Sequence, residues 1–205
     1  MIVLVITCDK YAHVVPTFWH FYRKNWLENP FQTLIVTTTQ PIDVPAPVLC
    51  LGEDKQFASN MINLLTYHIH DPVFMFFHED YILRWVNHVE IMHAADLIQR
   101  PDIDCIRLKS MPVPAAEGEF PGFGEIEKGA QWSLSHQVGF WKRDAYRSLL
   151  IPGNDPWDTE MYGSSRTTRL SGRILGAMKP VIYYGQYYTA RQVNEREVLW
   201  CKENW

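Results

Sequence analysis

The chain has 205 residues and a mass of 24.0 kDa, which suits one domain with a substantial core. Hydrophobic residues make up 47% of the sequence and aromatic residues 14%, and this composition excludes an intrinsically disordered chain. The net charge of −4 argues against a protein that coats nucleic acid along its whole surface, and we expect a single domain over residues 1–205.

The N-terminal third of the chain alternates strands with helices. An apolar run at residues 2–6 predicts a buried strand, and Pro16 suits the first turn of a helix whose apolar residues follow at spacings of three and four. A strand at residues 33–38 then closes a right-handed βαβ unit. Three prolines predict an extended or turning backbone in the next segment, and we expect residues 48–51 to form a short edge strand. A helix with Asp54 as its N-cap leads into the next strand.

The central strand of the prediction lies at residues 73–77, where five consecutive apolar residues follow a proline. A run of this kind is typical of a strand that is buried on both faces of a sheet. It ends in His78 and two adjacent carboxylates, Glu79 and Asp80. Because ligands of open α/β sheets bind at the carboxyl ends of the strands, we expect Glu79 and Asp80 at the edge of a cleft.

The second half of the chain continues the alternation with one break. Residues 110–130 hold three prolines and four glycines, which predict a long loop, either a mobile segment over the cleft or a surface excursion. Asp155 and Pro156 predict a capped helix start. The other predicted elements are helices over residues 86–99, 143–150 and 194–202 and strands over residues 105–108, 131–141 and 181–184.

This alternation predicts an α/β fold, in which helices cover both faces of a mostly parallel central sheet in a three-layer, Rossmann-like arrangement. Charge is uneven along the chain. Residues 142–196 carry nine basic and five acidic side chains, a net charge of +4. The segment therefore suits either phosphate groups or a solvated helix surface.

Cysteines and apolar segments bear on where the protein resides. The four cysteines are far apart in the sequence, which is typical of reduced thiols in an intracellular protein. No apolar run approaches the ~18 residues that a membrane span needs. Residues 2–6 also lack the basic flank of a signal peptide. We expect a cytoplasmic protein without a membrane span.

Two interpretations are open for the carboxylates that end the central strand. Glu79 and Asp80 are hard oxygen ligands suited to Mg²⁺ or Mn²⁺, which bind proteins through a few carboxylates and complete their coordination with substrate phosphates. Alternatively, the pair only terminates a strand and begins the next turn. The residues of this stretch alone do not decide between a metal site and a turn.

Several short segments carry a resemblance to a known family. They are Thr7-Cys8-Asp9-Lys10-Tyr11, the stretch from Phe76 to Leu83, Ser133-Leu134 followed by Phe140 to Arg143, and Asp155 to Glu160. Their order and spacing resemble the glycosyltransferase superfamily with the GT-A fold, and more narrowly small glycosyltransferase-like proteins of bacteria and their phages. The resemblance covers roughly residues 2–190 and implies transfer of a hexosyl or pentosyl group from a nucleotide sugar.

The resemblance also implies a donor site. In this fold the loop after the first strand holds the nucleotide, which corresponds here to Thr7, Asp9 and Tyr11. An Asp-x-Asp motif binds a divalent metal at the diphosphate, and the matching residues are Glu79 and Asp80. Glu-Asp-Tyr departs from that motif, so Asp80 is the better ligand candidate and dependence on Mn²⁺ or Mg²⁺ stays open. The family's usual third ligand has no counterpart in this sequence.

A carboxylate base is the other group that the resemblance implies. Family members place it at a helix start after the acceptor-side strand, and the matching residues are Asp158 and Glu160. An inverting transfer needs such a base within hydrogen-bond reach of the acceptor hydroxyl. If Asp155 and Asp158 stabilise the N-terminus of the helix, Glu160 is the carboxylate left free. We predict Glu160 as the base, with Asp158 as the alternative.

The predicted function is therefore that of a nucleotide-sugar-dependent glycosyltransferase, with UDP or a related nucleotide in the donor and an unidentified acceptor. Two alternatives are open. A phage enzyme that glycosylates hydroxymethylated bases in DNA would use the +4 charge of residues 142–196 against a phosphate backbone. A non-catalytic module that binds a nucleotide or sugar would explain the departure from Asp-x-Asp.

Overall fold

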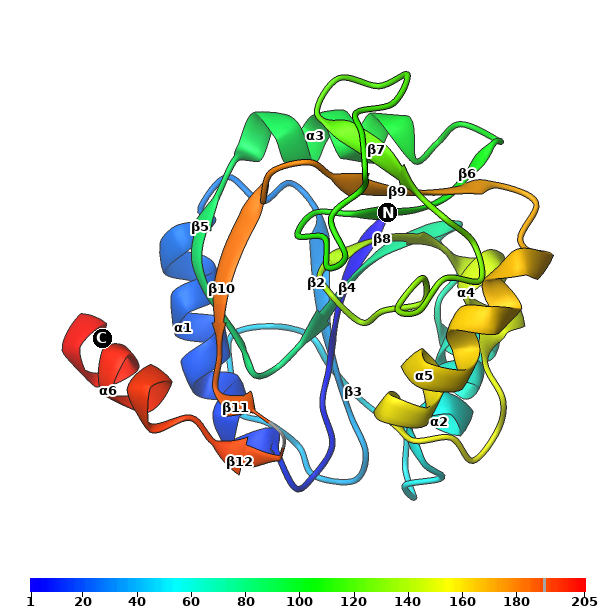
Figure 1. The fold of residues 1–205 in the computed structure, drawn as a ribbon. Coiled ribbons are helices and arrows are strands. Elements are labelled where there is room, and N and C mark those ends of the chain that lie inside the picture. The colour runs from blue at the N-terminus through cyan, green and yellow to red at the C-terminus, as the bar shows by residue number, and fades with distance from the viewer. Residues whose placement is uncertain (190) are drawn as a thin grey trace.

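The computed structural model describes residues 1–189 and 191–205. It has three layers, with helices on both faces of an 8-stranded sheet (Figure 1). In spatial order the strands are β3 (Val48–Cys50), β2 (Gln32–Thr37), β1 (Ile2–Ile6), β4 (Val73–His78), β8 (Gly139–Lys142), β6 (Ile103–Arg107), β9 (Arg173–Ala177) and β7 (Phe123–Ile126). Only β8 and β7 run antiparallel to their neighbours. The predicted α/β fold with a mostly parallel central sheet is confirmed.

Helices alternate with single strands or short groups of strands along the chain. The α-helices are α1 (Val15–Asn25), α2 (Phe57–Asn63), α3 (His88–Leu97), α4 (Arg143–Leu149), α5 (Pro156–Arg166) and α6 (Glu195–Asn204). A π-helix over Leu64–His68 extends α2, and 3-10 turns lie at Ala12–Val14 and Thr167–Arg169. In residues 1–189 and 191–205, none of the helices is long and apolar enough to cross a bilayer.

The central strands β1 and β4 divide the apolar core into two parts. Successive side chains of a strand point to opposite faces. Val3 of β1 therefore packs in the cluster that contains Phe18 of α1, whereas Leu4 packs in the cluster that contains Met61 of α2. All five residues of β1 are buried, and so are the first five of β4. This confirms the prediction that residues 73–77 form a strand buried on both faces.

Two small antiparallel ribbons complete the fold. β5 (Tyr81–Val86) pairs with β10 (Ile182–Gln186), and β11 (Tyr188–Thr189) pairs with β12 (Gln192–Val193). Neither β5 nor β9 was predicted, because the residues that pair with them are distant in the sequence. The pairing of β5 leaves only Glu79 and Asp80 between β4 and β5, so the two carboxylates occupy a tight turn.

Two predictions near α2 and β8 are wrong. Asp54 is not the N-cap, because α2 begins at Phe57 and Asp54 accepts hydrogen bonds from the Gln56 N–H at 2.9 Å and the Asn60 side-chain amide at 2.8 Å. The strand expected at residues 131–141 is restricted to β8, since Trp132 has a φ of 64° and belongs to a turn.

The remaining predicted elements are present, with ends shifted by a few residues. Asp155 is the N-cap of α5, as predicted, and accepts a hydrogen bond from the Asp158 N–H. The segment at residues 110–130 is not wholly a loop, because it contains β7, which forms an edge of the main sheet against β9.

Gly139 sits where β8 is inserted between β4 and β6. A Cβ at this residue would lie 2.6 Å from the Ile106 carbonyl oxygen and 3.1 Å from the Arg107 Cα, both backbone atoms of the paired strand. We expect Gly139→Ala to lower the free energy of unfolding by about 1–3 kcal/mol, as overpacking does in cores. Urea denaturation measures this change.

Gly118→Ala is the matched control, because a Cβ there would make an ordinary contact of 3.4 Å with the Phe123 carbonyl oxygen. Equal losses of stability in the two variants would show that the close approach of β8 to β6 is not the cause.

Candidate active site

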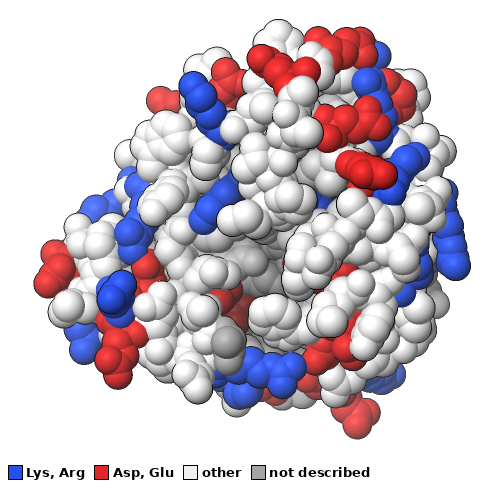
Figure 2. All heavy atoms as spheres, in the orientation of Figure 1, with Lys and Arg blue, Asp and Glu red and all other residues white. Residues whose placement is uncertain are grey.

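A cavity of about 550 Å³ opens at the carboxyl ends of β1, β2 and β4, and Figure 2 shows a hollow at the centre of this face. Residues of α2 and α5 form one side, and residues of β11 and the turn after β4 form the other. Of residues 110–130, only Met111 is among the described lining residues, so this segment does not cover the cavity. The surface excursion is the alternative that the structure favours.

The carboxylates of Glu79 and Asp80 both line the cavity. Glu79 is only 5% exposed, and burial together with the charge of Asp80 raises its pKa well above the usual range. Burial also raises the pKa of Asp80, to about 7, against the lowering effect of backbone N–H groups at Asp80 and Tyr188. Two adjacent carboxyl groups are thus held where ionisation is costly unless a cation is nearby.

Glu79 and Asp80 have the chemistry of a partial metal site. Within the described part of the chain, neither forms an ion pair with a lysine, arginine or histidine. No group of three His, Cys, Asp or Glu side chains in residues 1–189 and 191–205 could hold an ion alone. The pair therefore fits Mn²⁺ or Mg²⁺ only when a ligand supplies further oxygen atoms.

Thr7 and Tyr11, in the loop after β1, line the cavity, and Asp9 does not. The Asp9 carboxylate accepts hydrogen bonds from the backbone N–H groups of Thr39 and Gln40, at 2.8 Å each, and from the Thr39 hydroxyl. These hydrogen bonds hold the pKa of Asp9 well below its usual range. Asp9 thus ties the loop after β1 to the loop after β2, which positions the cavity wall.

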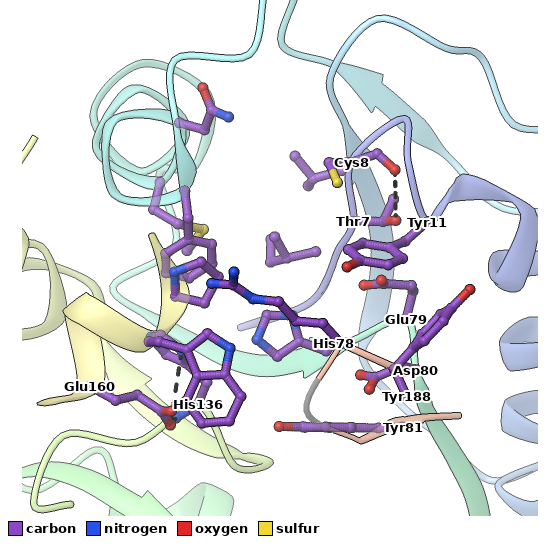
Figure 3. Close-up of a pocket in the computed structure, with 18 of the residues that line it drawn as sticks. Thr7, Cys8, Tyr11, His78, Glu79, Asp80, Tyr81, His136, Glu160 and Tyr188 are labelled. Atoms are coloured by element: carbon purple, nitrogen blue, oxygen red, sulfur yellow. Dashed lines mark hydrogen bonds and ion pairs between the residues drawn. The ribbon is translucent and has the colours of Figure 1, made fainter. Parts of the chain in front are cut away.

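An aromatic pair connects this loop to the C-terminal part of the chain. The rings of Tyr11 and Tyr188 have centroids 4.9 Å apart, and the Tyr188 hydroxyl lies 3.0 Å from Nε2 of His13. Figure 3 shows Thr7, Tyr11, Glu79 and Asp80 on the same side of the cavity. Predicted donor-site residues from two separate strand ends are therefore brought together.

Glu160 lies across the cavity from these residues, beside His136 (Figure 3). Its Oε1 accepts hydrogen bonds from the Ser135 hydroxyl at 3.0 Å and from the His136 backbone N–H at 2.6 Å. Two donors on one oxygen fix the orientation of the carboxylate and leave the other oxygen available to a ligand. The side chain is 16% exposed, so it can reach a bound molecule.

Asp158 is placed differently. It is absent from the lining of the cavity, and its backbone N–H donates to Oδ1 of Asp155 at 2.8 Å in the first turn of α5. A carboxylate in this turn stabilises the positive end of the helix dipole. Of the two carboxylates that the sequence nominates as a base, Glu160 is the one that faces the cavity.

Two histidines that the sequence analysis left unassigned also belong to the cavity. His78 follows the apolar part of β4, and His136 is enclosed by the rings of Phe57 and Phe76 at centroid distances of 4.7 and 5.4 Å. Burial lowers the pKa of both histidines to about 3, and the charge of Arg107 contributes to the shift of His136. Both rings are therefore neutral at pH 7. Figure 3 shows His78 between the two sides of the cavity.

Arg107 lies fully buried beneath this side of the site. Its guanidinium donates to the backbone carbonyls of Trp132 and Ser133, which lie in the same turn segment as Ser135 and His136. Desolvation lowers the pKa of Arg107, while the nearby charge of Glu160 acts in the opposite direction. Arg107 thus holds the segment that in turn holds Glu160.

The basic side chains of residues 142–196 mostly bind within the protein. Lys142 and Arg166 donate to backbone carbonyls, and Arg173 pairs with Asp102 and Glu119. Arg191 is the one lysine or arginine among the described residues that line the cavity. The net charge of this segment therefore does not form a basic surface at the site.

Sequence reasoning missed His78, His136, Ser135, Tyr188 and Arg191. A signal existed for His78, because it directly precedes the carboxylate pair on the same strand. The other four come from irregular segments or from the short β11–β12 ribbon, and their sequence neighbourhoods carry no such signal.

No family model and no curated protein matches the sequence. The fold is similar to solved structures. A mannosyltransferase from Pyrobaculum calidifontis, PcManGT, solved in complex with GDP-Man and Mn²⁺, has a TM-score of 0.59 and 12% identity over 93% of this chain and 57% of that chain. TarS 1-349 from S. aureus has a TM-score of 0.59 and 12% identity over 91% of this chain and 60% of that chain.

The chain thus spans less than two thirds of the length of either of these structures. At 12% identity the likeness shows the fold alone. The order of the strands and these similarities lead to one conclusion: the chain has a GT-A, Rossmann-like fold.

Proposed function

We propose that this chain is a glycosyltransferase that moves a hexose or pentose from a nucleotide donor to an acceptor hydroxyl. One observation carries the proposal: in a GT-A fold, a single cavity holds Glu79 and Asp80 on one side and Glu160 on the other. The chemistry needs positive charge near a leaving diphosphate and a base near the attacking hydroxyl. Glu79 and Asp80 can hold the cation that supplies this positive charge, and Glu160 can act as the base.

The donor side would hold the nucleotide and a divalent ion. The mannosyltransferase PcManGT was solved with GDP-Man and Mn²⁺. In this chain Glu79 and Asp80 would hold Mn²⁺ or Mg²⁺ together with diphosphate oxygens, and the ion would stabilise the charge that develops on the leaving group. Thr7 and Tyr11 line the adjoining wall, which supports a role in binding the base and ribose.

The acceptor side would hold the base. As the acceptor oxygen bonds to the anomeric carbon, the bond from that carbon to the diphosphate oxygen breaks, and the hydroxyl proton passes to Glu160. Ser135 and the His136 N–H keep the Glu160 carboxylate in position for this transfer. Transfer in a single displacement inverts the anomeric configuration.

The first test is nucleotide binding. We expect UDP or GDP to bind more tightly with Mn²⁺ than without it, and Asp80→Asn to lower the affinity measured with Mn²⁺ by about tenfold or more, because the ion loses a charged ligand. Isothermal titration calorimetry measures both affinities. Glu125→Gln, at the one exposed residue of β7, is the control. Failure of the wild-type protein to bind any nucleoside diphosphate would contradict the proposal.

The second test compares the two candidate bases. Glu160→Gln keeps the shape of the side chain, and we expect it to lower kcat for donor hydrolysis or transfer by about 10²–10⁴-fold, the usual contribution of a general base. Asp158→Asn should retain most of the rate, because Asp158 does not line the cavity. The opposite order would assign the base to Asp158, and a wild-type protein without any turnover would favour the non-catalytic module.

The third test uses pH. Burial raises the pKa of Asp80 to about 7, so Asp80 is mostly protonated in the cation-free protein at pH 6.5, and burial also raises the pKa of Glu79 well above its usual range. A divalent ion requires the ionised forms. We expect Mn²⁺ affinity in the presence of nucleotide to rise from pH 6 to pH 8, with protons released at pH 6.5 as the ion binds. Titrations in buffers of different ionisation enthalpy count these protons, and none released would show that the carboxylates do not bind the ion.

A further inference from the structure

Acidic residues outnumber basic ones in the described lining of the cavity. Four acidic residues line it, Asp54, Glu79, Asp80 and Glu160. Among the described lining residues Arg191 alone carries a lysine or arginine side chain. A nucleoside diphosphate would bring further negative charge into this cavity. The position of the Arg191 guanidinium therefore affects the affinity for a phosphate group.

We propose that Arg191 binds the phosphate oxygens of the donor, and that Asp155 holds the Arg191 side chain when the donor is absent. The proposal rests on the proposed function and adds a residue to it. Arginine suits the role because its planar guanidinium binds phosphate with two parallel hydrogen bonds.

The backbone places Arg191 on the donor side of the cavity. The residue immediately precedes β12, whose partner β11 contributes Tyr188 to the lining. The Tyr187 N–H donates to the Asp80 carbonyl at 2.8 Å, and the Asn194 N–H donates to the Tyr187 carbonyl at 2.9 Å. The base of this ribbon is therefore bound to the turn that carries Glu79 and Asp80.

The ion pair with Asp155 is weak enough to exchange. Nη2 of Arg191 lies 3.0 Å from Oδ2 of Asp155, and the two side chains are 65% and 32% exposed. Ion pairs this exposed contribute little to stability, whereas a phosphate group carries more charge and accepts two hydrogen bonds from one guanidinium. A bound diphosphate can therefore take Arg191 from Asp155.

Asp155 keeps its place after Arg191 leaves, because its two oxygens have separate partners. Oδ1 accepts the Asp158 N–H and caps α5, while Oδ2 faces Arg191. The helix that carries Glu160 is therefore not released when the ion pair breaks. The same division allows the two roles of Asp155 to be separated by substitution, since asparagine caps helices about as well as aspartate.

The experiment measures binding of UDP and GDP, with uridine and guanosine as probes that lack phosphate. We expect Arg191→Ala to weaken nucleoside diphosphate binding at least tenfold and to leave nucleoside binding within twofold, with Arg191→Lys in between. Asp155→Asn should tighten nucleoside diphosphate binding about two- to fivefold, because it removes the competing charge and keeps the cap. Arg196→Ala, at an exposed residue of α6 outside the cavity lining, is the control.

Unchanged nucleoside diphosphate affinity in Arg191→Ala would overturn the inference and leave the proposed function intact. Weaker binding in Asp155→Asn, with unchanged thermal unfolding, would overturn the competing role of Asp155. A wild-type protein that binds neither nucleoside diphosphate would overturn both this inference and the proposed function.

Discussion

The site depends on a buried cation that has no carboxylate partner in the described residues. Arg107 is 0% exposed, and its guanidinium is neutralised by no ion pair but is satisfied in part by backbone carbonyls of Trp132 and Ser133. A buried charge of this kind is costly unless its hydrogen-bond partners are fixed. The irregular segment before β8 is therefore held in one conformation. That conformation brings Ser135 and the His136 N–H to Glu160.

The carboxylates of the cavity lie in contrasting environments. Glu160 receives two hydrogen bonds and lies near the charge of Arg107, so its orientation is set by the protein alone. Glu79 and Asp80 lie side by side without a cationic partner in the described chain, and their raised pKa values record the cost of holding them there. Carboxyl groups in such different environments can take different roles within one site.

The sequence predicted the parts of the fold that local patterns determine. The apolar runs of β1 and β4, the N-cap of α5 and the carboxylates after β4 were all placed from neighbouring residues. β5 and β9 escaped prediction because their strand character depends on partners far along the chain. Asp54 failed as a cap because Gln56, with a φ of 71°, delays the start of α2. His136 carries no local signal, since its position follows from a turn fixed by Arg107.

The pairing of β5 with β10 has a consequence for the order of folding. Tyr81 lies opposite Gln186, so the ribbon that closes the turn of Glu79 and Asp80 joins segments that are distant along the chain. Contacts across such long loops form late, because the loss of chain entropy precedes the gain from pairing. β1, α1 and β2 can associate early through local contacts. The turn of Glu79 and Asp80 should reach its final shape only once the C-terminal ribbon has docked, so an incompletely folded chain would form its sheet before this side of the cavity.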